Sequence, residues 1–407
     1  MSVLKHQNRT PKVLTLSALN AVKRGALDQS RVVGLTHRFY RYPARFSPTF
    51  VSSTIECFSS PGDVVLDPYM GGGTTVVEAF ARGRIGIGSD LNSLAVFVAR
   101  AKTTQLNNLE RRIVIDWVSN EIPTLSYHTV TDEVAELVCP LRTRNLNLPR
   151  ARPVKKLLAL ALLSLKSLPS DATQNFVRCV LLNVAQWALN NRKSAPTLAM
   201  VREKIVKSAF EMLNGLTELS EITQRHKSSP TPPILIHGTA ADLPKFHPFH
   251  DGRKANLVVT SPPYPGIHIL YHRWQVDGRK ETPAPYWIAD CKDGKGSSFY
   301  NFSDRGPEAM EDYFAESLST LNAIRKVMAS GAVIVQMVAF SNPKNQLPRY
   351  LRNMELAGFE EIRELHDDGR ERPFKRIWRP VPSRKWYANL KGNTCSSREV
   401  VLLHHAP

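Results

Sequence analysis

Apolar and polar residues follow two kinds of pattern along the 407-residue chain. Short runs of valine, leucine and isoleucine, bounded by glycine, proline and polar residues, occur toward both ends and predict buried strands of a parallel sheet. In the middle, apolar residues recur at helical spacing over 157–168, 172–191 and 197–224. The pattern therefore predicts an alternating strand and helix protein with a largely helical insertion.

The strand pattern appears on both sides of this insertion. Seven strands are predicted, at 63–66, 85–88, 234–236, 257–259, 332–338, 360–365 and 399–403, and the last two are expected to be antiparallel neighbours. Helices are predicted between them, and 265–308 is predicted to be loop. This order indicates an α/β, Rossmann-like sheet of seven strands. Three parts are expected, over 1–103, 104–232 and 233–407.

The charge of the chain points to a polyanionic partner. Lys and Arg number 54 against 36 Asp and Glu, which gives +18 and a pI near 9.8. An inert basic surface is the alternative. No run approaches the about 20 apolar residues that cross a bilayer, and no secretion signal is recognisable. The five cysteines are far apart and form no C-x-x-C pair, so we expect neither disulfides nor a metal site.

The first candidate motif is D-P-Y-M-G-G-G-T-T at 67–75, between a predicted strand and a predicted helix. Glycines at this position let the backbone approach a ligand, and a carboxylate before them can bind a cationic or hydroxyl group. The dinucleotide pattern G-x-G-x-x-G fails, because the sixth place from Gly71 is Val76. No Gly-Lys-Ser/Thr follows, which excludes a phosphate loop. A tight turn without a ligand is the remaining alternative.

The second candidate is Asp90, which ends the next predicted strand. A carboxylate in this position can accept hydrogen bonds from the two hydroxyls of a ribose. Taken alone, an Asp after a strand is more often a helix N-cap. Together with the glycine loop, it predicts a nucleoside site.

The third candidate is T-S-P-P-Y at 260–264, directly after the predicted strand 257–259. The two prolines hold the chain extended, so the carbonyl of Pro262 can point into a cleft. Ser261 adds an acceptor, and Tyr264 offers a flat face for a base. Two acceptors beside a stacking face suit the amino group of a flipped base, whose lone pair stays free to attack an electrophile. A linker, the alternative use of such prolines, would not directly follow a strand.

Together these motifs resemble those of the amino-methylating DNA methyltransferases, enzymes that use S-adenosylmethionine to modify cytosine N4 or adenine N6. The segment 67–75 is similar to the family's cofactor motif, with Tyr69 in the usual place of Phe, and Asp90 and 261–264 match its ribose-binding acid and catalytic tetrapeptide. The segment 41–48 is similar to one that closes over the methionine end of the cofactor. The resemblance covers 37–103 and 234–405, and implies a cofactor-binding half in 1–103 and a catalytic half in 233–407.

The resemblance also implies site residues. The catalytic set is Ser261, Pro262, Pro263 and Tyr264. The cofactor-binding set is Ala44, Arg45, Phe46, Asp67, Pro68, Tyr69, Gly71, Gly73, Thr74, Asp90 and Asn92. The family often has Gly-Asp in its third motif, whereas Gly238 is followed here by Thr239, so Asp242 is expected to contact the adenine instead. Ser-Pro-Pro-Tyr is more typical of cytosine-N4 enzymes, so this activity is expected, with adenine-N6 methylation as the alternative.

Double-stranded DNA is the expected substrate, with affinity that falls steeply with salt. Basic and aromatic side chains predict DNA contacts after the tetrapeptide, at Arg273, Trp274, Arg279 and Lys280, and in the insertion, at Arg142 and Arg144. A similar stretch lies at 370–387. We expect the insertion to recognise the target or to brace the fold. The predicted protein is a cytoplasmic enzyme of prokaryotic or phage type, with a cognate restriction endonuclease as candidate partner. An RNA amino-group methyltransferase or a non-catalytic nucleic-acid-binding protein would also fit these motifs.

Overall fold

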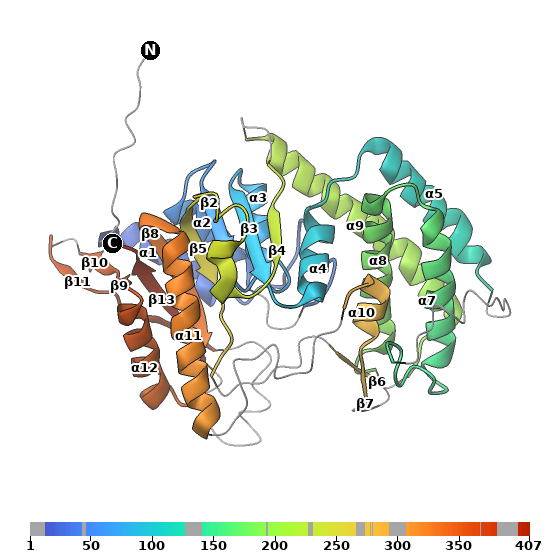
Figure 1. Cartoon of the computed structure of the whole chain (residues 1–407). Helices are drawn as coiled ribbons and strands as arrows, with labels where there is room; N and C mark the ends of the chain where they lie inside the picture. The colour runs from blue at the N-terminus through green and yellow to red at the C-terminus, as the bar shows by residue number, and fades with distance from the viewer. Residues whose placement is uncertain are drawn as a thin grey trace, which may run out of the picture.

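A mixed sheet forms the centre of one half of the molecule (Figure 1). The structure is a computed structural model, and it describes residues 13–42, 46–126, 141–192, 194–226, 231–265, 273–276, 278, 280–292, 307–366, 368–380 and 398–407. The strand order is β12-β13-β8-β5-β2-β3-β4, and β9 pairs with β13 as an eighth strand. Their bounds are β2 Val64–Asp67, β3 Ile85–Asp90, β4 Ile234–His237, β5 Ala255–Thr260, β8 Met328–Ala339, β9 Glu360–Glu361, β12 Ile377–Pro380 and β13 Arg398–His405.

Strand direction agrees with the predicted fold class. Strands β4, β3, β2, β5 and β8 are mutually parallel, and β13 is antiparallel to β8. The chain leaves β2 for β3 and β4 on one side and returns through β5 and β8 on the other, which is the doubly wound arrangement. The α/β, Rossmann-like prediction is therefore confirmed. The strand order reverses between β2 and β5, so a crevice is expected at the carboxyl ends of these two strands.

One predicted strand is divided in the structure. Residues 360–361 form β9, antiparallel to β13 as expected, but β10 (Arg363–Leu365) joins a separate sheet with β1 (Val13–Thr15) and β11 (Glu371–Pro373). The break falls at Ile362, which is buried in the core beside β13. Strand β12, which the sequence did not predict, completes the edge of the main sheet. The prediction of seven strands in one sheet was therefore wrong in number.

Both faces of the sheet are covered by helices, as its apolar strands require. Leu66 and Val258 face α11 (Pro307–Val327), α12 (Pro343–Leu356) and the 3-10 helix η2 (Ala240–Lys245). Their neighbours Val65 and Val259 face α1 (Leu16–Leu27), α2 (Pro48–Phe58) and α3 (Thr74–Ala81). Alternate residues of each strand thus belong to different cores, which fixes the register of the sheet.

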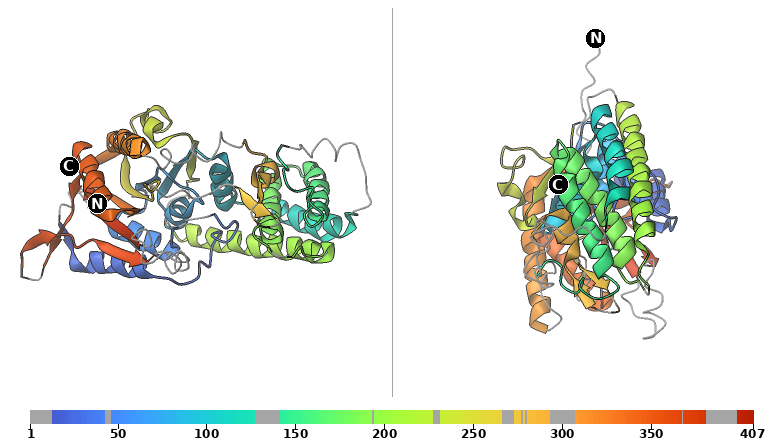
Figure 2. Two further views of the ribbon diagram at one scale, coloured as in Figure 1. Left: turned by 90° about the horizontal axis from the view of Figure 1, so that it is seen from below. Right: turned by 90° about the vertical axis from the view of Figure 1, so that its right-hand side faces the viewer.

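The insertion forms a layer of helices beside the sheet, at the other end of the molecule (Figure 2). Its elements are α5 (Asn108–Thr124), α7 (Arg152–Ser164), the 3-10 helix η1 (Leu165–Ser167), α8 (Asp171–Leu189) and α9 (Leu198–Gln224), and they contain the three predicted helical stretches. Helix α4 (Ser93–Thr103) lies between this layer and the sheet (Figure 1). Leu219 of α9 packs against Phe80 of α3, so α9 contacts both halves. The boundaries at 103 and 232 stay a prediction.

The predicted loop 265–308 contains ordered elements. Strands β6 (Trp274–Val276) and β7 (Lys280–Thr282) form a hairpin, and α10 (Ala284–Ala289) follows. Trp274 and Tyr286 lie in the same core as α8 and α9, so the hairpin and α10 pack against the helical layer. None of the described helices combines the length and apolarity that crossing a membrane requires.

Candidate active site

The three motifs meet at the carboxyl edge of the sheet. Strands β3, β2 and β5 are parallel neighbours, and a motif begins at or directly after the end of each of them. The hydroxyl of Thr260, the last residue of β5, donates to Oδ1 of Asp67 at 2.7 Å. The glycine loop and the tetrapeptide are thus joined by a buried hydrogen bond, although they lie far apart in sequence.

Backbone geometry explains the glycines of the first motif. Gly71 and Gly73 have φ of 46° and 75°, in the left-handed region that favours glycine. A Cβ on Gly73 would also lie 2.9 Å from the Cβ of Ala99 on α4. Gly73 caps α3, so the amino end of this helix points toward the loop.

Asp90 anchors the glycine loop. Its carboxylate accepts hydrogen bonds from the backbone N–H groups of Gly71 and Asn92, both at 2.8 Å. Burial raises the pKa of Asp90 to about 6, although these two donors lower it in part. A carboxylate has about four lone-pair sites, so two remain for a ligand.

A second buried carboxyl lies beside Asp90. Burial raises the pKa of Asp67 to about 6, the hydrogen bonds from Thr260, Thr75 and Tyr69 oppose this, and the charge of Asp90 adds to it. Two buried carboxyl groups side by side create a site that favours a cation.

The tetrapeptide is held by hydrogen bonds on several sides. Ser261 Oγ lies 2.9 Å from the Tyr264 hydroxyl and 3.0 Å from the carbonyl of Met337 on β8. Tyr264 donates to Glu399 on β13 at 3.0 Å. The Tyr313 hydroxyl donates to the carbonyl of Pro263 at 2.9 Å. Among the described residues, none donates to the carbonyl of Pro262, which leaves it as an acceptor for a ligand.

The side chain of Asn92 forms three hydrogen bonds within the protein, which the sequence did not indicate. Its side chain accepts from the N–H of Leu94 at 2.9 Å and from the hydroxyl of Tyr286 at 3.0 Å, and donates to the hydroxyl of Tyr42 at 3.1 Å. It is 2% exposed and caps α4. These contacts occupy much of the side chain, and the assignment of Asn92 as a cofactor ligand stays a prediction.

The remaining predicted cofactor residues lie in different surroundings. Thr74 is the first residue of α3, and Pro68 and Tyr69 begin the glycine loop. Burial raises the pKa of Tyr69, which bonds to Thr320 of α11. Phe46 packs against Phe50 in the core behind the sheet, and Ala44 and Arg45 lie outside the described residues.

Asp242 reaches the same edge of the sheet, because η2 follows β4. Its carboxylate pairs with Lys245 at 2.6 Å, and its side chain is 39% exposed. A ligand that used Asp242 would share it with this lysine.

The predicted DNA contacts divide into buried and exposed residues. Trp274 is 2% exposed, and its indole N–H donates to the Tyr40 hydroxyl at 3.0 Å, so it cannot stack on a base and that prediction was wrong. Arg142 donates to the carbonyls of Tyr286 and Cys291 and therefore fastens α10.

Charged surface residues fit the DNA prediction better. Arg144 and Lys280 are exposed, whereas Arg273 is partly buried and pairs with Glu281 at 3.8 Å. Arg279 lies outside the described residues.

Sequence reasoning missed Glu399 and Arg379, which lie behind the tetrapeptide. They are 6% and 7% exposed and form an ion pair of 2.7 Å across the antiparallel strands β13 and β12. The sequence of β12, Ile-Trp-Arg-Pro, does not mark its arginine as buried, although in the structure buried and exposed residues alternate along this strand and Arg379 is buried. Only the strand pairing shows that this charge has a buried partner.

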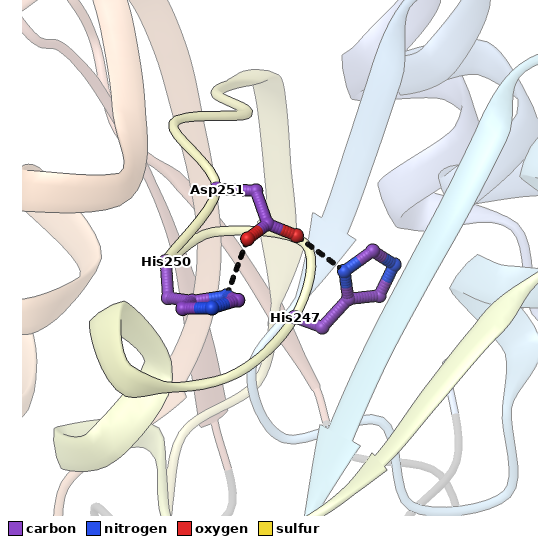
Figure 3. Close-up of side chains that lie close together, drawn as sticks. All are labelled: His247, His250 and Asp251. Carbon is purple, nitrogen blue, oxygen red and sulfur yellow. Dashed lines mark hydrogen bonds and ion pairs between the residues drawn. The ribbon is translucent and has the colours of Figure 1, made fainter.

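Three side chains of types that can ligate a metal ion lie together at the opposite edge of the sheet. His247, His250 and Asp251 belong to the segment between η2 and the start of β5, whereas Ser261 follows the end of that strand. Both imidazoles bond to the Asp251 carboxylate, at 2.6 and 2.9 Å (Figure 3). All three residues are exposed, and their position separates them from the three motifs.

Comparison with known proteins agrees with the sequence motifs. A family model for N6/N4 enzymes, described as DNA methylase, matches residues 9–99. The chain is 33% identical over 108 residues to Type II methyltransferase M.MvaI of Kocuria varians, which covers 25% of this chain and 24% of that protein. It is 27% identical over 84 residues to Type II methyltransferase M.MjaII of Methanocaldococcus jannaschii, which covers 20% and 16%. The matches thus span a quarter or less of each relative.

Solved structures give weaker similarities. TrmN from Thermus thermophilus aligns over 91% of this chain and 53% of that chain, with 11% identity and a TM-score of 0.34. The rRNA methyltransferase aviRa from Streptomyces viridochromogenes aligns over 93% and 94%, with 10% identity and a TM-score of 0.33.

Proposed function

Residues 9–99 belong to the amino-methylating DNA methyltransferase family, and from this premise we propose that the whole chain transfers a methyl group from S-adenosylmethionine to the N4 amino group of cytosine in duplex DNA. The observation that carries the proposal is the hydrogen bond of Thr260 to Asp67, which sets the acceptors of the tetrapeptide beside the glycine loop. Ser261 in the tetrapeptide favours cytosine over adenine. Adenine-N6 methylation is the second candidate.

The residues at the edge of the sheet fit S-adenosylmethionine. Asp90 keeps two lone-pair sites for ribose hydroxyls, and the turn at Gly71 and Gly73 leaves the backbone accessible. The buried carboxyls Asp67 and Asp90 favour a ligand with positive charge. When bound, this cofactor supplies a methyl group attached to a positively charged sulfonium sulfur. Loss of the methyl group leaves that sulfur as a neutral thioether.

In this proposal, most of the rate enhancement comes from positioning the amino group in line with the transferred methyl group. The exocyclic amine is a poor nucleophile because its lone pair is delocalised into the ring. Hydrogen bonds from its two protons to Ser261 Oγ and the Pro262 carbonyl favour a pyramidal nitrogen, and they strengthen as the nitrogen becomes positive. No covalent intermediate with the protein is required. Tyr264 presents its ring to the flipped base.

The partner and the location follow from the same proposal. The charge of +18 and the exposed Arg144 and Lys280 support a DNA substrate. The helical layer is proposed to recognise the target, and a cognate restriction endonuclease is a candidate partner. A DNA-modifying enzyme of this kind would act on the nucleoid in the cytoplasm.

Methyl transfer can be tested directly. Purified protein is incubated with labelled S-adenosylmethionine and duplex DNA, which is then digested to nucleosides and separated. Label in N4-methylcytosine is the expected result. Label in N6-methyladenine would reverse the choice of base, label in RNA alone would exchange the substrate, and no label in any nucleic acid would contradict the proposal.

Cofactor affinity is expected to depend on pH near 6. Asp90 must be ionised to accept both ribose hydroxyls, and burial raises its pKa to about 6. Affinity for S-adenosylmethionine is therefore full above pH 7 and falls as the pH drops through 6, by up to about tenfold per unit for this one group. Calorimetry between pH 5 and 8 measures this slope. Constant affinity down to pH 5 would contradict the role of Asp90.

A further inference from the structure

A continuous chain of hydrogen bonds leads from the tetrapeptide to a buried ion pair. Ser261 Oγ lies 2.9 Å from the Tyr264 hydroxyl, which lies 3.0 Å from Glu399 Oε1. The other oxygen of Glu399 binds Nε and Nη2 of Arg379, at 2.8 and 2.7 Å. Arg379 also donates to the carbonyl of Ala26 in α1, at 3.2 Å. The acid behind the site is therefore fixed by its own strand and by two further elements.

The protons that these groups carry decide which group donates each hydrogen bond. Glu399 is paired with a guanidinium, which always carries its charge, so its carboxylate is an acceptor only. Tyr264 therefore donates to Glu399, and its oxygen accepts from Ser261 when the serine donates. Ser261 has one proton for Tyr264 or for the Met337 carbonyl at 3.0 Å. In both arrangements that proton points into the protein, and a lone pair of Ser261 stays accessible to an amino group.

We propose that Glu399, held by Arg379, is a positioning residue of the methyl-transfer site and the end of a proton path from Ser261 through Tyr264. This inference rests on the proposed function. The inference goes beyond that function because it assigns the Tyr264 hydroxyl and the ion pair a part in the reaction, in addition to the stacking role of the ring.

The proton path accounts for the proton that the amino group loses during methyl transfer. As the N–C bond to the methyl group forms, the C–S bond breaks, its electron pair stays on sulfur, and the nitrogen becomes positive. The nitrogen loses its proton to Ser261 Oγ, the Ser261 proton passes to Tyr264, and the Tyr264 proton passes to Glu399. Glu399 is then neutral beside Arg379 and returns its proton to water after the product leaves.

A second ion pair on the same side of β13 provides a matched control. Glu361 of β9 binds Nε and Nη2 of Arg376, at 2.7 and 2.9 Å. It has the same chemistry as the pair of Glu399 and Arg379, and β9 also pairs with β13. Within the described part of the chain, the Glu361 carboxylate bonds to Arg376 and not to the tetrapeptide. The side chains of Arg376 and Glu361 are 30% and 28% exposed, against 9% and 8% for Arg379 and Glu399. Glu361→Gln therefore controls for the loss of an acid that pairs with an arginine beside β13, and the binding constants control for damage to the buried site. A proton path predicts a loss of rate at Glu399 without a loss of binding.

The experiment compares four variants of the full chain in single-turnover methylation of duplex DNA. Glu399→Gln is expected to lower the rate about 10- to 100-fold, because an amide cannot take the proton. The dissociation constants for S-adenosylmethionine and DNA should stay within twofold. Glu399→Asp should recover part of the rate, and Glu361→Gln should leave it unchanged. Tyr264→Phe, which keeps the ring, should lower the rate as far as Glu399→Gln.

A double variant at Tyr264 and Glu399 distinguishes a shared proton path from two independent defects. The double variant Tyr264→Phe with Glu399→Gln should be no slower than either single variant, because one broken link already interrupts the path. A rate of Glu399→Gln within twofold of wild type would overturn the inference, as would equal losses in Glu399→Gln and Glu361→Gln. If the wild-type protein methylates no nucleic acid, the proposed function itself fails and this inference with it.

Discussion

Replacing Asp90 by alanine is expected to weaken the binding of S-adenosylmethionine by about 100-fold or more. The carboxylate would accept two ribose hydroxyls, and a hydrogen bond to a charged group contributes about 1.5–3 kcal/mol. The variant also removes the acceptor that holds the N–H of Gly71 at 2.8 Å, so the glycine loop loses an anchor. Calorimetry at pH 7.5, above the raised pKa of this carboxyl, measures the loss.

Asp251→Ala is the matched control for this variant. Asp251 is also an aspartate with two partners, a hydrogen bond to His247 and an ion pair with His250, but it lies at the opposite edge of the sheet (Figure 3). Its replacement should leave cofactor affinity unchanged, and Asp90→Asn, which keeps one acceptor, should fall between the two. An affinity of Asp90→Ala within threefold of wild type would show that the ribose binds elsewhere.

The carboxyl edge of the sheet could be predicted because its determinants are local in sequence. Each strand is a short apolar run followed at once by its motif, and parallel strands place their carboxyl ends together. The helices of the insertion were predicted for a similar reason, since apolar residues at helical spacing are visible in a single segment. Asp67, Asp90 and Ser261 therefore lie where the sequence placed them.

Residues whose partners are distant in sequence could not be assigned. Trp274 looked like a stacking residue beside basic neighbours, but its partner Tyr40 lies 234 positions away and buries it. The family resemblance implied Asn92 as a ligand, yet Tyr42 and Tyr286 bond to its side chain. Arg379 lies in the basic and aromatic stretch 370–387, and only strand pairing shows that it lies opposite Glu399.

Replacing Ser261 by alanine is expected to lower the rate of methyl transfer about 100-fold. The variant removes one of two acceptors that bind the amine more tightly in the transition state than in the ground state, and losing one such group at an active site costs about 100-fold or more in kcat. It also interrupts the path to Glu399. Single-turnover transfer of labelled methyl groups, at saturating DNA and cofactor, measures this step.

The comparison with binding identifies where the loss arises. Ser261 lies at the end of β5, and the glycine loop makes its own bonds to Asp90, so the affinity of Ser261→Ala for S-adenosylmethionine should stay within twofold of wild type. Ser167→Ala removes an exposed serine hydroxyl that donates to the carbonyl of Ser164 within its own helical turn, and it should keep the full rate. A full rate in Ser261→Ala would remove the tetrapeptide from the reaction. A rate and an affinity that fall together would instead show that Ser261 supports the cofactor site, because an interaction made only in the transition state lowers the rate alone.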